Sequence, residues 1–137
     1  MYDTILVPVA LDNENGRIGH AISVARRLAS DGASITLLHV VEAVPTYAMS
    51  YISADVMSET REEIEIEMNR LAASAGAGVS GKVVDGHSGR SILDHAEQTG
   101  ADLIVIASHR PDMQTLLLGS TATQVVRHAK CAVHVLR

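Results

Sequence analysis

The chain has few aromatic residues and almost no cysteine. Its 137 residues include no Phe and no Trp, and the three aromatic side chains are Tyr2, Tyr47 and Tyr51. Because 47% of the residues are nevertheless hydrophobic, the core must be built from aliphatic side chains. The one cysteine, Cys131, excludes an internal disulfide and agrees with a reducing compartment. A chain of this length can bury roughly 68% of its unfolded surface, so we expect one domain over residues 1–137.

Basic charge and long apolar runs are also scarce. The 11 Lys and Arg residues are outnumbered by 16 Asp and Glu, which gives a formal net charge of −5. A nucleic acid partner is not expected, because such binding depends on a basic surface or on aromatic stacking. No apolar run approaches the ~20 residues of a membrane span, and the segment after Met1 does not resemble a signal peptide. We therefore expect a soluble, cytoplasmic protein with no membrane partner.

Aliphatic runs alternate with helical patterns along the chain. The runs have the composition of strands buried on both faces of a parallel sheet. Between them, apolar residues recur at helical spacing, and Gly32 and Gly100 follow two of these segments, where glycine often closes a helix in the left-handed conformation. The alternation predicts an α/β fold, an open, mainly parallel sheet of five strands with helices on both faces. The expected strands are 4–9, 35–41, 82–85, 103–107 and 131–136, and the helical stripes lie within 18–29, 64–75, 92–96 and 122–129.

The segment 42–55 interrupts this alternation and contains Tyr47 and Tyr51. A loop of this length is often a lid or a binding segment. The alternatives are a disordered segment, or a surface loop whose tyrosines cover the edge of the sheet. The acidic run 59–67 that follows is expected to be the solvated face of a helix, because Ile64 and Met68 keep the opposite stripe apolar.

A ligand of an open α/β sheet binds beyond the carboxyl ends of the strands, where the strand order reverses. The residues that follow Val7, Val40 and Ile106 should therefore converge. The third of these stretches reaches a helix start at 119–121, with the sequence Gly-Ser-Thr. Free N–H groups, the helix dipole and two hydroxyls favour an anion such as phosphate at this point. The alternative is that Ser120 is an ordinary N-cap without a ligand.

Two familiar phosphate-binding patterns do not apply. The chain has no Gly-x-x-x-x-Gly-Lys-Ser/Thr, which excludes a P-loop. Gly76, Gly78 and Gly81 do spell G-x-G-x-x-G, but they follow a helix and precede a strand, the reverse of the order in a dinucleotide site. We interpret this stretch as a flexible turn.

Catalytic patterns are equally sparse. Ser108, His109 and Asp112 include the residue types of a hydrolase triad, but they crowd into five positions without a G-x-S-x-G elbow. The seven histidines form no H-E-x-x-H motif and have no companion cysteines, so no zinc site is predicted. No general base has an obvious partner, and we expect a protein that is not an enzyme.

Six segments, in order along the whole chain, form a recognisable set: Ile5–Val9, Leu38–Val40, Ala101–His109, Leu117–Ser120, Val125–Ala129 and Val133–Val135. Together they resemble the universal stress protein family, and Ser108–Asp112 with Leu117–Ser120 are most similar to its F type. The resemblance implies a sheet of order 3-2-1-4-5 and, in many members, ATP bound between strands one and four. Weak hydrolysis of that ATP is a lesser alternative to binding alone, because no general base has an obvious partner.

The ATP-binding pattern of the family, Gly-x2-Gly-x9-Gly-Ser/Thr, is matched in part. Its last pair is Gly119-Ser120, whereas Ala107 takes the place of the first glycine and Arg110 lies near the second, with eight residues instead of nine between Arg110 and Gly119. Arg110 can bind phosphate through charge-assisted hydrogen bonds. The aspartate usual after the first strand is Ala10, with Asp12 two residues on, and Val40 occupies the position whose backbone meets adenine.

The resemblance therefore predicts a regulatory or sensor protein that binds ATP, or AMP or ADP, with Asp112 as a candidate Mg²⁺ ligand. The alternative is a family member that binds no nucleotide and acts as a dimeric interaction module. In both cases a homodimer through the apolar edge strand 131–136 is expected. The adenine and ribose would contact Pro8, Val9, Ala10 and Val40, and the phosphates Ala107, Ser108, His109, Arg110, Gly119, Ser120 and Thr121.

Overall fold

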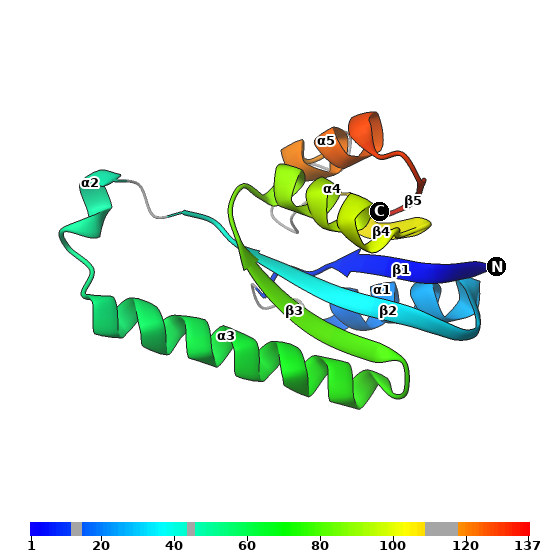
Figure 1. Cartoon of the computed structure of the whole chain (residues 1–137), viewed down its shortest axis with the longest axis horizontal. Helices are drawn as coiled ribbons and strands as arrows, with labels where there is room; N and C mark the ends of the chain where they lie inside the picture. The colour runs from blue at the N-terminus through cyan, green and yellow to red at the C-terminus, as the bar shows by residue number, and fades with distance from the viewer. Residues whose placement is uncertain (12–14, 44–45, 109–117) are drawn as a thin grey trace.

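A computed structural model describes residues 1–11, 15–43, 46–108 and 118–137 of the chain (Figure 1). The sheet has five strands in the order β3-β2-β1-β4-β5, and all neighbouring strands are parallel. The predicted α/β fold and strand order are thus confirmed. The elements are β1 (Tyr2–Pro8), α1 (Asn15–Leu28), β2 (Ala29–Val41), α2 (Thr46–Met49), α3 (Ala54–Ala75), β3 (Val79–Asp85), α4 (Ser88–Thr99), β4 (Leu103–Ala107), α5 (Ser120–His128) and β5 (Ala132–Leu136).

Helices cover both faces of the sheet, which explains the aliphatic runs. In β1, Ile5 and Val7 belong to the core that packs against α1 and α3, whereas Leu6 belongs to the core under α4 and α5. All three side chains are at most 1% exposed. Figure 1 shows α4 and α5 on one side of the sheet and α3 on the other. Successive residues of a strand point to opposite faces, so a strand covered on both faces needs an uninterrupted apolar run.

The first boundary that differs from the prediction lies in β2. This strand begins at Ala29, which we predicted to be the last residue of the preceding helical stripe. Its register against β1 shifts between the pairs Tyr2–Ala29 and Thr4–Ser34. Gly32 has a φ of 77°, but it lies inside this irregular stretch and does not close α1. Gly100 does close α4 in the left-handed conformation, as predicted.

The prediction of a flexible turn for the G-x-G-x-x-G stretch is wrong at its last glycine. Gly76 and Gly78 have positive φ and lie in the connection from α3 to β3. Gly81 is part of β3, and a Cβ added there would be 2.8 Å from the Met68 carbonyl oxygen of α3. Glycine is needed at 81 because helix and strand approach each other closely.

The segment 42–55 contains the short helix α2 and leads into α3. Ser53 caps α3, and its Oγ accepts the Val56 N–H at 3.1 Å. Tyr47 and Tyr51 are 80% and 88% exposed, so the interpretation that they cover the edge of the sheet is wrong. The acidic residues of the run 59–67 lie mainly on exposed positions of α3, as predicted. Within the described part of the chain, no helix combines the length and apolar character needed to cross a membrane.

Candidate functional site

The carboxyl ends of β1 and β4 lie side by side at one edge of the sheet. The two strands are parallel neighbours, with Ile5 opposite Leu103 and Leu6 opposite Ile104. From this edge the chain continues from β1 into α1 on one face and from β4 into α5 on the other. The reversal of strand order therefore lies between β1 and β4, the place where the sequence predicts a ligand.

The backbone just after β1 is fixed by β2. The Val9 N–H donates to the Leu38 carbonyl at 2.8 Å, and the Val9 carbonyl oxygen lies 2.9 Å from His39 Nδ1. The latter contact requires a proton on Nδ1, because a carbonyl oxygen can only accept. Val9 is buried, whereas the next residue, Ala10, is exposed. Pro8 ends β1, and Val40 is half-buried in β2, one residue beyond the histidine.

The end of β4 is tied to the start of α5. The Ser108 N–H donates to the Leu136 carbonyl at 2.7 Å, and the Ser108 carbonyl accepts the Gly119 N–H at 2.6 Å. Ser108 is 1% exposed, whereas Ala107, the last residue of β4, is exposed. These contacts give Ser108 a clear role in placing α5; a direct contact with phosphate stays a prediction.

The first turn of α5 provides an anion-binding geometry. Helix α5 begins at Ser120 and its N-cap is Gly119, so the alternative in which Ser120 is the N-cap is wrong. A glycine cannot cap N–H groups with a side chain, and no side-chain cap bond is present. Ser120 is exposed and Thr121 half-buried. The N–H groups of the first turn, two hydroxyls and the helix dipole therefore fit a phosphate group.

Three candidate residues, His109, Arg110 and Asp112, lie outside the described residues, as does Asp12. In the described ranges, no cluster of three or more potential metal-ligating side chains occurs. The predicted Mg²⁺ ligand is therefore untested.

Sequence reasoning missed two residues at this edge. Arg17 brings a cation to the first turn of α1, which starts at the carboxyl edge because it follows β1. The contact of His39 with Val9 was also not foreseen, although a polar side chain within an otherwise apolar strand is a signal that could have drawn attention to it.

The model of the Universal stress protein family matches residues 1–137. The chain belongs to this family. Universal stress protein A homolog 2 of Coxiella burnetii is 33% identical over an alignment of 141 positions, which covers 99% of this chain and 95% of that protein. Universal stress protein G of Escherichia coli O157:H7 is 32% identical over an alignment of 144 positions, which covers 100% of both proteins. The similarity to the F type is not among these findings and stays a prediction.

Solved structures of universal stress proteins have the same fold. Universal stress protein UspA from Lactobacillus plantarum has a TM-score of 0.73 and 26% identity, over 99% of this chain and 98% of that one. A universal stress protein solved in complex with cAMP has a TM-score of 0.69 and 21% identity, over 99% of this chain and 97% of that one. A universal stress protein from Archaeoglobus fulgidus, solved in complex with dAMP, has a TM-score of 0.66 and 18% identity, over 99% and 98%. At these lower identities the likeness establishes the fold alone.

Proposed function

We propose that this universal stress protein binds an adenine nucleotide, ATP or else AMP or ADP, at the carboxyl edge of β1 and β4. In the cell it would act as a cytoplasmic sensor or regulator. The observation that carries the proposal is the start of α5, where Gly119 leaves the N–H groups of the first turn without a side-chain cap. The complexes of two related folds with cAMP and dAMP support the choice of an adenine nucleotide.

The proposed site divides into an apolar part and a phosphate part. Val9, Ala10 and Val40 would contact the base and ribose through backbone and aliphatic groups. The N–H groups of α5 and the hydroxyls of Ser120 and Thr121 would hold the phosphates. Pro8, Ala107 and Ser108 would shape the edge, and the sequence predicts further phosphate contacts from His109 and Arg110.

We propose binding without turnover. The His39 imidazole has Nδ1 bonded to the Val9 carbonyl and supports the backbone. A general base must instead be within reach of the attacking water. Steady phosphate release from ATP that disappears in Ser120→Ala would contradict this part of the proposal.

Calorimetric titration with ATP, ADP and AMP tests the proposal. We expect a dissociation constant between about 0.1 and 10 μM for at least one nucleotide. Ser120→Asp should weaken binding about tenfold or more, because a carboxylate then faces the phosphates. The fold should tolerate this variant, since an acidic residue at the start of a helix interacts favourably with the dipole. The control is Ala54→Asp, which introduces a carboxylate at the exposed first residue of α3. It should bind nucleotide like the wild type. No heat with any of the three nucleotides would refute the proposal.

The homodimer is proposed on the position of β5, which lies at the edge of the sheet and pairs with β4 alone among the described strands. The strand starts at Ala132, one residue later than predicted. An apolar edge strand invites a second strand. In sedimentation experiments we expect a dimer for the wild type and a monomer when the exposed positions are charged in Ala132→Lys with His134→Lys. A monomeric wild type, or a variant that stays dimeric, would contradict this interface. A dimer that binds no nucleotide would favour the alternative, an interaction module.

A further inference from the structure

Helix α2 and the first turns of α3 form an arm, residues 46–60, that extends away from the sheet (Figure 1). From Ser53 to Thr60 every residue is exposed, so both sides of the helix face solvent there. A helix in a compact domain normally buries one face. In the rest of α3 one face packs against the sheet, whereas in these two turns the same face is exposed to solvent.

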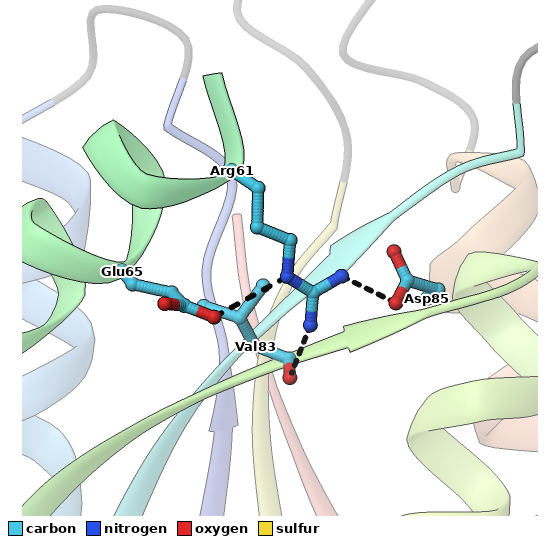
Figure 2. Close-up of polar contacts among 4 residues, drawn as sticks. All are labelled: Arg61, Glu65, Val83 and Asp85. Atoms are coloured by element: carbon cyan, nitrogen blue, oxygen red, sulfur yellow. Dashed lines mark hydrogen bonds and ion pairs between the residues drawn. The ribbon is translucent and has the colours of Figure 1, made fainter. Parts of the chain in front are cut away.

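The root of the arm is an ionic clamp on β3. The Arg61 guanidinium bonds to the Asp85 carboxylate, to the Val83 carbonyl at 3.4 Å and to the Glu65 carboxylate at 3.3 Å (Figure 2). Asp85 is the last residue of β3. The clamp therefore holds α3 at the end of β3. The turns of α3 that precede Arg61 lie beyond the end of this strand, so they have no strand of the sheet to pack on.

The arm has large exposed side chains of apolar character. Met57 precedes Ile64 by seven residues, two helical turns, so it continues the stripe formed by Ile64 and the buried Met68. Met57 is 40% exposed and its neighbour Val56 52% exposed. Tyr47 and Tyr51, which precede the helix in the arm, are 80% and 88% exposed, so the arm presents an apolar surface made of these four side chains. Exposed apolar groups mark interaction surfaces, and Tyr and Met are enriched at interfaces.

Carboxylates flank this surface. Between Ser53 and Glu67, α3 has six acidic residues and one basic residue, Arg61, which the clamp already neutralises. Asp55, Glu59, Glu62 and Glu63 take part in no ion pair within the described part of the chain. A second copy of the arm would bring like charges together, whereas a Lys- or Arg-rich partner would be attracted.

We propose that the arm docks a basic amphipathic segment of another protein. The apolar face of that segment would lie on Tyr51, Val56 and Met57, and its Lys or Arg side chains on Glu59 and Glu63. The pairing of the two apolar faces would supply affinity, and charge complementarity would supply orientation.

The experiment measures fluorescence anisotropy of a labelled peptide titrated with the full-length protein without nucleotide. The peptide has about 18 residues, with Leu at helical spacing on one face and Lys on the other. A matched peptide with Glu in place of Lys is the charge control. We expect binding of the Lys peptide, weakening as salt is added, and no binding of the Glu peptide.

Two pairs of variants locate the binding surface. Tyr51→Ser with Met57→Ser should weaken binding about tenfold, whereas Ile66→Ser, at an exposed apolar position (61%) outside the stripe of α3, should not change it. Glu59→Gln with Glu63→Gln should weaken binding severalfold. The control is Asp3→Asn with Asp31→Asn, which neutralises two exposed carboxylates on other elements and should not change binding.

Three results would overturn the proposal. The first is no binding of the Lys peptide, and the second is equal binding by the arm variants and their controls. The third is self-association of the wild type that Tyr51→Ser with Met57→Ser abolishes, because the arm would then bind a second copy of the chain.

Discussion

Replacing Gly81 by Ala tests how closely α3 packs on β3. The added Cβ would lie 2.8 Å from the Met68 carbonyl oxygen and 3.3 Å from the Met68 Cβ, whereas ordinary contact begins at 3.4 Å. Helix and strand must therefore separate by about 0.6 Å, which loosens the packing of the buried Met68 and Leu71. Overpacking of this kind lowers the free energy of unfolding by about 1–3 kcal/mol. Replacing Gly by Ala also reduces the conformational entropy of the unfolded chain, which offsets about 0.4–1 kcal/mol of this loss. We expect a net loss of about 1–2 kcal/mol and a Tm lower by about 4–8 °C.

Urea and thermal unfolding followed by far-UV circular dichroism measure this loss. Gly19→Ala is the control, because no atom lies within 4 Å of a Cβ at this position in α1. That variant should gain about 0.5–1 kcal/mol from helix propensity. If Gly81→Ala were as stable as the wild type, the close approach of helix and strand would not be the reason for glycine at this position.

Three further predictions concern stability. The Asp102 carboxylate accepts hydrogen bonds from the N–H groups of Asp3 and Thr4 at 2.9 and 3.0 Å. Burial raises the pKa of this carboxyl group, but the hydrogen bonds outweigh burial and hold the pKa below its usual value. Asp102→Asn should therefore lose about 1–2 kcal/mol at neutral pH, and urea titrations should show the difference vanishing as pH falls through the folded-state pKa. Arg61→Gln should change the global free energy of unfolding little, because the ion pairs are exposed, yet it should speed amide hydrogen exchange in the first turns of α3; uniform exchange would contradict the clamp. Ile104→Ala, at a fully buried position, should cost about 2–5 kcal/mol in the same titrations, and a loss below 1 kcal/mol would contradict a tightly packed sheet.

The elements that the sequence predicted best are those buried on both faces. The run 103–107 became β4 without a shift, because a strand covered by helices on both sides must be apolar throughout. The start of β3 was missed, because Ser80 and Gly81 have neither apolar side chains nor strand propensity. Alternation alone predicted a parallel sheet; the strand order came from the family resemblance.

The candidate site was predictable in place but only partly in detail. Gly119 and Ser120 were recognised as a helix start, yet the cap lies one residue earlier than Ser120, because glycine can occupy the N-cap through its backbone alone. The role of Ser108 in joining β4 to α5 and β5 depends on backbone bonds across the fold, which local patterns do not contain. The contact of His39 with Val9 spans 30 residues and is equally invisible to local spacing.

The most direct test of the central claim is an amide NMR titration of the wild-type protein with ATP. Nucleotide binding at the carboxyl edge of β1 and β4 predicts saturable shifts at Val9, Ala10, Val40 and the first turn of α5, at Ser120 and Thr121. Absence of shifts would contradict it. So would shifts confined to the hollow at the other end of the sheet, lined by residues that include Ala96, Ala101 and Cys131.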